Sequence, residues 1–139
     1  MDRRRTILLV DDDTDFVRSI RVLLESDGYD VSCAFSASEC RLELEEKKPD
    51  LILLDVMMER FVAGLSLADE LRADREFKSI PIVMMSAVRQ EAGLDVGASS
   101  GGGFLAADAF LDKPVPPNVL LATVKRLLES RGSSGSGRR

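Results

Sequence analysis

The chain has 139 residues, the length of one ordinary domain, and 45% of them are apolar, enough for a core without disulfides or a structural metal. Its 19 Lys and Arg against 24 Asp and Glu give a net charge of −5, which disfavours a general role in binding nucleic acid or membranes. The chain contains no histidine, which excludes Ser-His-Asp and Cys-His triads, histidine metal ligands and a phosphohistidine on this chain.

The cysteines and the apolar runs indicate the cellular compartment. Cys33 and Cys40 are expected to be reduced thiols rather than a disulfide framework. No apolar run has the length of a membrane-spanning helix, and the run at residues 6–10 is too short for the core of a signal peptide. We therefore expect a cytoplasmic protein without membrane insertion.

The first third of the chain predicts strand, helix and strand. Residues 6–10 form a short apolar run that is typical of a strand buried on both faces. Asp13 or Thr14 can cap a helix that ends near Gly28, with apolar residues at helical spacing at Phe16, Val17, Ile20, Leu23 and Leu24. A second strand follows, in which Val31, Cys33 and Phe35 stand at every second position.

The next elements are a helix, a third strand and another helix. Ser36 and Glu39 form a capping box for a helix that ends near residues 47–49. Residues 51–54 predict a third buried strand that ends at Asp55, and residues 56–63 predict a loop. A helix over residues 64–73 is expected to turn three side chains inward, those of Leu65, Ala68 and Leu71.

The last part of the chain contains a break in the pattern. Residues 80–85 predict a fourth strand, with Pro81 near its start, but residues 89–105 are rich in glycine and predict an irregular loop. Residues 109–111 predict a fifth strand, and a last helix begins at Pro117 or Asn118 with inward residues Leu120, Leu121, Val124, Leu127 and Leu128. Residues 131–139 have a linker-like composition, so we expect a domain over 1–130 and a flexible tail over 131–139.

Five apolar strands that alternate with helices predict an α/β fold, a parallel sheet with helices on both faces. In such folds ligands bind at the carboxyl ends of the strands. The residues at these ends are Asp11 to Asp13, Asp55, Ser86 and Lys113. Carboxylates gathered at one edge raise each other's pKa unless a cation joins them, and an oxygen-only cluster with access to water suits Mg²⁺. A carboxylate beside such an ion is a plausible nucleophile toward phosphorus, with Lys113 as a second positive charge.

The segments around these residues read ILLVDDD (7–13), LILLDVMM (51–58), MMSA (84–87) and DAFLDKP (108–114). In this order and at these spacings they resemble the signature blocks of bacterial response-regulator receiver domains of the chemotaxis-regulator type. The resemblance covers about residues 5–130. It implies a flavodoxin-like fold, doubly wound, with five parallel strands in the order 2-1-3-4-5. It also implies a role in two-component, phosphorelay signal transduction.

The resemblance implies a phosphoacceptor and a metal site. Asp55 would be the phosphoacceptor and one of the Mg²⁺ ligands. Asp12 would bind the ion directly and Asp11 through water, and the backbone carbonyl of Met57 would complete the protein ligands. Asp13 would lie outside this set and cap the following helix.

The resemblance also implies a set of residues that bind the phosphoryl group and respond to it. Ser86 would take the position of the switch hydroxyl, with Ala87 after it, and Lys113 would pair with the phosphoryl group. Phe110 would take the aromatic switch position, and the peptide bond before Pro114 would be cis.

Two segments depart from the family pattern. Glu59 stands where a proline is common, and the stretch up to Gly64 is one residue longer than usual. The distance from Ser86 to Lys113 is about five residues longer, and the excess falls in the glycine-rich segment 89–105. The usual fourth helix, and the output or dimer surface that includes it, are therefore in question.

Each site residue also has an ordinary structural interpretation. Asp11 to Asp13 could cap a helix, Asp55 and Ser86 could be turn residues, and Lys113 could be a solvated strand end. These interpretations would all have to hold together at four strand ends, so we favour the functional one. Phe110 is different, because a buried core residue explains it as well as a switch does.

We therefore predict a phosphoacceptor signalling domain rather than an enzyme, one that assists its own phosphorylation and dephosphorylation. Its partners would be a sensor histidine kinase or a histidine phosphotransfer protein and an unknown downstream protein, with no direct contact to nucleic acid. One alternative is an interaction module that works without phosphorylation through the segment 89–105. Another is a phosphatase of the haloacid dehalogenase type with Asp11 as nucleophile, although Asp15 departs from that family's first motif.

Overall fold

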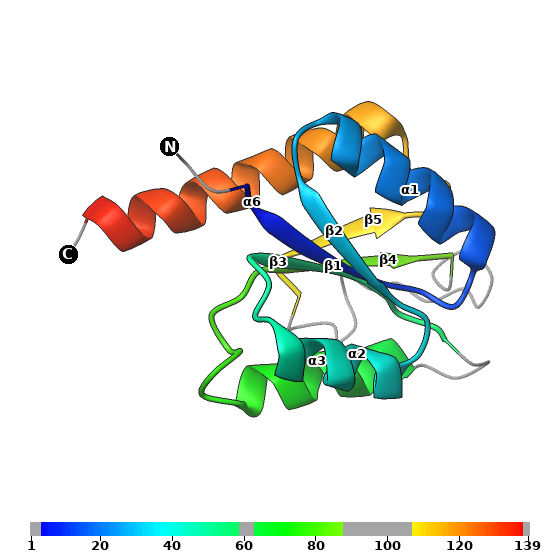
Figure 1. Ribbon diagram of the computed structural model, residues 1–139, viewed down its shortest axis with the longest axis horizontal. Coiled ribbons are helices and arrows are strands. Elements are labelled where there is room, and N and C mark those ends of the chain that lie inside the picture. The colour runs from blue at the N-terminus through cyan, green and yellow to red at the C-terminus, as the bar shows by residue number, and fades with distance from the viewer. Residues whose placement is uncertain (1–3, 59–62, 88–106, 138–139) are drawn as a thin grey trace.

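In the computed structural model, the chain forms a parallel sheet between two layers of helices (Figure 1). The structure describes residues 4–58, 63–87 and 107–137, without the side chains of 65 and 131–137. Its strands are β1 (Thr6–Val10), β2 (Asp30–Ala34), β3 (Leu51–Asp55), β4 (Ile82–Ser86) and β5 (Ala109–Asp112). Its helices within these ranges are α1 (Thr14–Ser26), α2 (Ala37–Glu46), α3 (Ala63–Ala73) and α6 (Pro117–Gly137). The strands are parallel and lie in the order β2-β1-β3-β4-β5, which confirms the predicted fold.

The central strands are buried on both faces, as their continuous apolar runs predict. Successive side chains of a strand point to opposite faces, so β1 divides its residues between two cores. Ile7 and Leu9 pack in the cluster with residues of α1 and α6, whereas Leu8 and Val10 pack in the cluster with residues of α2 and α3. Figure 1 shows the same two layers, with α1 and α6 on one side of the sheet and α2 and α3 on the other.

The predicted helix starts are confirmed by their caps. The Asp13 carboxylate accepts a hydrogen bond from the Phe16 backbone N–H at 3.1 Å, which satisfies a donor that the first turn of α1 leaves free. The Ser36 hydroxyl accepts from the backbone N–H of Glu39 at 3.1 Å in the same way at the start of α2. Gly28 follows α1 with a φ of 97°, the left-handed conformation that its position predicts.

Among the strand boundaries that differ from the prediction, two lie where a backbone N–H is not available to the sheet. The Phe35 N–H bonds to the Glu39 carboxylate at 2.8 Å, so β2 ends at Ala34 and the Phe35 side chain is partly exposed. Pro81 has no N–H to donate, and β4 begins only at Ile82.

Both later helices also differ from the prediction. Helix α3 buries Leu67 in addition to Ala68 and Leu71, and the side chain of Leu65 lies outside the described residues. The backbone of α6 continues to Gly137, whereas the sequence predicts a flexible tail from residue 131. Each residue added to an existing helix gains a hydrogen bond without a new nucleation step, which allows a helix to extend into residues of low helix propensity. The irregular segment predicted at 89–105 lies outside the described residues.

Candidate functional site

The carboxyl ends of the four strands β1, β3, β4 and β5 bring the predicted site residues to one edge of the sheet. Asp11 follows β1, Asp55 and Ser86 are the last residues of β3 and β4, and Lys113 follows β5. The register of the strands fixes the positions of these residues along the sheet edge, because Asp55 pairs with Met85 and the backbone N–H of Lys113 bonds to the Ser86 carbonyl at 3.0 Å. Asp11 and Lys113, which are 102 positions apart in the chain, are thereby placed side by side.

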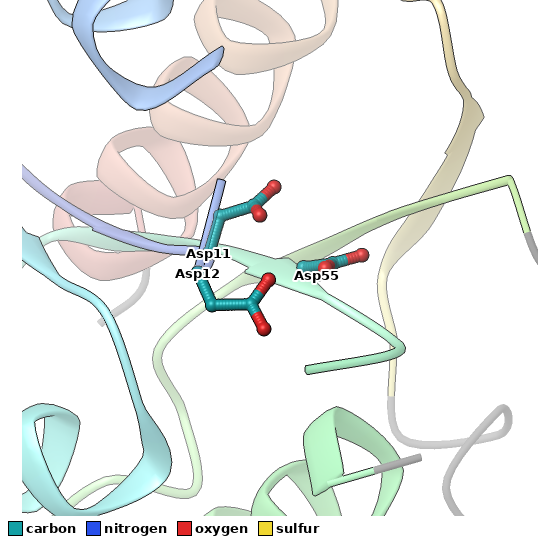
Figure 2. A group of neighbouring side chains, drawn as sticks. All are labelled: Asp11, Asp12 and Asp55. Carbon is teal, nitrogen blue, oxygen red and sulfur yellow. The ribbon is translucent and has the colours of Figure 1, made fainter. Parts of the chain in front are cut away.

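Three carboxylates form a compact cluster at this edge. Asp11, Asp12 and Asp55 each offer an oxygen that lies within 4.8 Å of the oxygens of the other two (Figure 2). Asp11 and Asp55 are buried, with exposed fractions of 0% and 5%, and Asp12 is exposed. Hard carboxylate oxygens with one side open to water are the ligands that Mg²⁺ prefers, so this donor set fits the predicted ion.

Lys113 provides the positive charge of the cluster. Its ammonium nitrogen Nζ lies 2.7 Å from Asp11 Oδ2 and 3.7 Å from Asp55 Oδ1. The lysine side chain is only 19% exposed, so these interactions are less screened by water than those of a surface ion pair. The ammonium also lies over the ring of Phe16, 4.3 Å from its centroid.

The Asp11 carboxylate is engaged on both of its oxygens. Oδ1 accepts a hydrogen bond from the backbone N–H of Asp13 at 3.0 Å, and Oδ2 accepts from Lys113. Both oxygens of Asp11 therefore already have hydrogen-bond partners in the folded chain. This arrangement does not favour the alternative of a phosphatase with Asp11 as nucleophile, and it agrees with an indirect role for Asp11 at an ion.

Asp55 has the most perturbed acid–base chemistry of the site. Burial, followed by the negative charge of Asp11, raises the pKa of Asp55 from 3.8 to about 7. The Lys113 charge and a hydrogen bond from the Met57 backbone oppose the rise, and the Asp12 charge adds to it. The folded chain therefore holds a carboxylate whose negative charge is poorly compensated without a bound cation.

The other predicted residues come from β3, β4, β5 and the segments that follow these strands. Ser86 is buried, Ala87 and Met57 are half-buried, and the bond between Lys113 and Pro114 is cis, the isomer that the resemblance implies. Phe110 is half-buried and packs against the core cluster that includes α2 and α3. These placements leave the switch roles and the carbonyl ligand of Met57 as predictions.

Two residues that shape the cluster carry no sequence signal of a site role. Gly64, in the first turn of α3, lies so close to β3 that a Cβ atom there would collide with the backbone carbonyl oxygen of Asp55 and would lie 2.8 Å from that of Val56. Its N–H also bonds to the Val56 carbonyl at 2.9 Å. Phe16 was assigned only to the apolar face of a helix. Neither contact has a signal in the sequence, because Phe16 and Lys113 are distant in the chain and no periodicity relates Gly64 to the end of β3.

Comparisons with known proteins identify related sequences. Residues 7–125 match the model of the family described as the response regulator receiver domain. The chain is 35% identical over 136 residues to the phosphate regulon transcriptional regulatory protein PhoB of Pseudomonas aeruginosa, covering 95% of this chain and 55% of that protein. It is 33% identical over 125 residues to the DNA-binding response regulator MtrA of Mycolicibacterium smegmatis, covering 90% of this chain and 51% of that protein. The chain thus spans about half the length of the curated relatives it matches.

Solved structures show the same fold. A putative response regulator from Chloroflexus aurantiacus superposes with a TM-score of 0.78 at 30% identity, covering 91% of this chain and 99% of that one. A CheY-like receiver domain protein from Methanospirillum hungatei superposes with a TM-score of 0.77 at 26% identity, covering 94% and 98%. Among the described residues, no helix is long and apolar enough to cross a membrane.

Proposed function

The chain belongs to the family of response regulator receiver domains, and on this premise we propose that Asp55 accepts a phosphoryl group from a phosphohistidine of a partner protein. The partner would be a sensor histidine kinase or a histidine phosphotransfer protein. The observation that carries the proposal is the position of Asp55, buried at the end of a central strand, beside two further carboxylates and 3.7 Å from the Lys113 ammonium. The modification would switch a protein-interaction surface.

The transfer can be written as one displacement at phosphorus. A carboxylate oxygen of Asp55 forms a bond to the phosphorus atom while the bond from phosphorus to the donor histidine nitrogen breaks. The nitrogen keeps the electron pair of that bond, and the product is an acyl phosphate on Asp55. Such reactions depend mainly on positioning and on compensation of the phosphoryl charge.

The residues of the cluster divide these tasks. Asp12 and Asp55, the Met57 carbonyl, and Asp11 through water would hold a Mg²⁺ ion, which supplies compensation of negative charge when it is bound. Lys113 would bind a phosphoryl oxygen through its ammonium group, and the Ser86 hydroxyl would donate a hydrogen bond to another. Their movement toward the phosphoryl group, with Ala87 beside Ser86, would transmit the modification to the surface around the ends of β4 and β5, and Phe110 would follow as an aromatic switch.

The same residues would assist removal of the phosphoryl group, so the domain is best regarded as a phosphoacceptor with limited self-catalysis. PhoB is a transcriptional regulator and MtrA a DNA-binding response regulator by their names. The expectation that this chain makes no direct contact with nucleic acid stays a prediction, and those relatives do not support it. A downstream protein partner and a cytoplasmic location are parts of the proposal.

The test is intact-mass spectrometry after incubation with acetyl phosphate and Mg²⁺. We expect one added phosphoryl group in the wild type, none without metal and none in Asp55→Asn. The matched control is Asp13→Asn, which removes an exposed acid from the loop after β1 but keeps a good helix cap. We expect this variant to be phosphorylated normally. A phosphoryl group that persists in Asp55→Asn contradicts the assignment. No addition to the wild type, even from a phosphorylated kinase, supports the alternative of an interaction module that works without phosphorylation.

A further inference from the structure

Phe16 lies in the first turn of α1, and the phosphoacceptor mechanism above gives it no task. Its ring lies under the Lys113 ammonium, with 4.3 Å between Nζ and the ring centroid. The face of an aromatic ring carries partial negative charge and attracts a cation at this distance. Phe16 therefore makes an interaction with the site that a leucine in the same helical position would not provide.

The ammonium of Lys113 is held by three groups that come from three elements of the fold. Asp11 after β1 is 2.7 Å away, Asp55 at the end of β3 is 3.7 Å away, and the ring of Phe16 in α1 provides the third contact. A lysine ammonium is a point charge on a flexible stem, so carboxylates by themselves fix its distance better than its direction. The ring adds a third fixed position.

Shielding from water makes this third contact stronger than a surface interaction of the same geometry. The Lys113 side chain is 19% exposed, and Phe16 is half-buried against the core cluster that includes α1 and α6. Cation–π attraction grows as the cation loses water. The Phe16 ring also borders an open, mainly apolar groove of about 730 Å³ beside Lys113, Pro114 and Val115. A smaller apolar side chain at position 16 can therefore be accommodated without a sealed cavity.

We propose that Phe16 is a positioning residue for phosphoryl transfer to Asp55, because its ring holds the Lys113 ammonium where a phosphoryl oxygen on Asp55 has to be bound. The inference rests on the proposed function of Asp55. Loss of the ring releases the ammonium toward Asp11 or toward solvent. The effect is on the rate of transfer rather than on the fold.

The test compares Phe16→Leu, which keeps an apolar side chain, with Phe16→Tyr, which keeps the ring face. In proton NMR spectra, the ring shifts the methylene protons next to Lys113 Nζ upfield in the wild type and in Phe16→Tyr, and the shift is lost in Phe16→Leu. With acetyl phosphate and Mg²⁺, we expect phosphorylation of Phe16→Leu to slow about three- to tenfold, consistent with a cation–π interaction shielded from water. Phe16→Tyr should stay within about twofold of the wild type on the same basis.

A packing role would give a different result in two controls. Leu23→Ala changes a half-buried residue of the same groove that is not part of the ring contact, and it should leave the rate unchanged. In a Lys113→Met background, Phe16→Leu should cause no further slowing, because the partner of the ring is already gone. An equal fractional loss in both backgrounds refutes the positioning role, as does an absent upfield shift in the wild type.

The failure of the inference is distinguishable from the failure of the proposed function. A wild type that acquires no phosphoryl group from either donor refutes the function, and the role of Phe16 in transfer with it. A wild type that is phosphorylated at the same rate as Phe16→Leu refutes the role of Phe16 alone. The NMR shift needs no phosphodonor and reports the ring contact in either case.

Discussion

Replacement of Asp55 with asparagine should stabilise the metal-free protein at neutral and alkaline pH. The substitution keeps the shape of the side chain and removes a negative charge that is buried beside Asp11. The rise in the pKa of Asp55 from 3.8 to about 7 means that the ionised carboxylate destabilises the folded state by about 4 kcal/mol, at about 1.4 kcal/mol for each tenfold change in proton affinity. We expect Asp55→Asn to raise the free energy of unfolding by about 2–4 kcal/mol at pH 8, because the amide does not regain every interaction of the protonated acid.

The direction of the pH dependence follows from the higher pKa of Asp55 in the folded state. The folded chain binds the proton of Asp55 more tightly than the unfolded chain does, so the protonated acid favours folding. This stabilisation is fully present below about pH 4 and is lost as the pH rises through about 7. The asparagine side chain does not titrate, so the advantage of Asp55→Asn over the wild type should grow between these two pH values and then level off.

Urea unfolding in EDTA at several values between about pH 4 and 8.5 measures this difference. Asp13→Asn is the matched control and should differ little from the wild type, because its side chain is exposed and asparagine caps a helix as well as aspartate. Saturating Mg²⁺ should stabilise the wild type and narrow its gap to Asp55→Asn, because the ion binds the folded state. A gap between the two proteins that stays constant over this pH range would refute the reasoning.

Three further predictions concern packing and hydrogen bonding in the fold. Gly64→Ala should lower the free energy of unfolding by about 1–3 kcal/mol and slow phosphorylation, because the new Cβ displaces the Asp55 carbonyl. The control Gly28→Ala has open space around its Cβ but a positive φ, so its free energy of unfolding should fall by about 1–2 kcal/mol without slower phosphorylation. Leu53→Ala in β3 should cost about 2–5 kcal/mol in urea unfolding with an unchanged m-value, and a loss below about 1 kcal/mol would contradict its full burial. Arg72→Met removes two hydrogen bonds to backbone carbonyls and the salt bridge to Asp108, which precedes β5. We expect it to lower the free energy of unfolding by about 1–3 kcal/mol in thermal unfolding, and an unchanged Tm would contradict this expectation.

Much of the fold and the composition of the cluster could be predicted from the sequence. Apolar runs as at residues 6–10 and 51–54 identify strands buried on both faces, and the capping residues Asp13 and Ser36 mark the starts of helices. These signals are local, because each depends on the spacing of side chains along a few turns or residues. Since parallel strands end at the same edge of a sheet, the acids after two strands and the lysine after another could be expected to meet.

The boundaries were less predictable because they depend on competition for hydrogen bonds. The alternation of apolar residues predicts that β2 extends to Phe35. The Phe35 N–H bonds to the Glu39 side chain rather than to the sheet, so the strand ends one residue earlier. The backbone helix of α6 continues to Gly137, past the point at which composition predicts a tail, because each added residue extends an existing helix by one hydrogen bond. Local propensity is a weak preference that such interactions can override.

The sequence by itself therefore determined that Asp11, Asp12 and Asp55 meet Lys113 at one edge of the sheet, because short apolar patterns locate the strands and the polar residues that follow them. Only the tertiary structure decided how these residues interact. The ring of Phe16 meets the ammonium of Lys113, and Gly64 lies against the carbonyl of Asp55, through contacts between segments that no periodicity relates. The raised pKa of Asp55 likewise depends on burial and on distances to Asp11 and Lys113, which exist only once the strands have assembled.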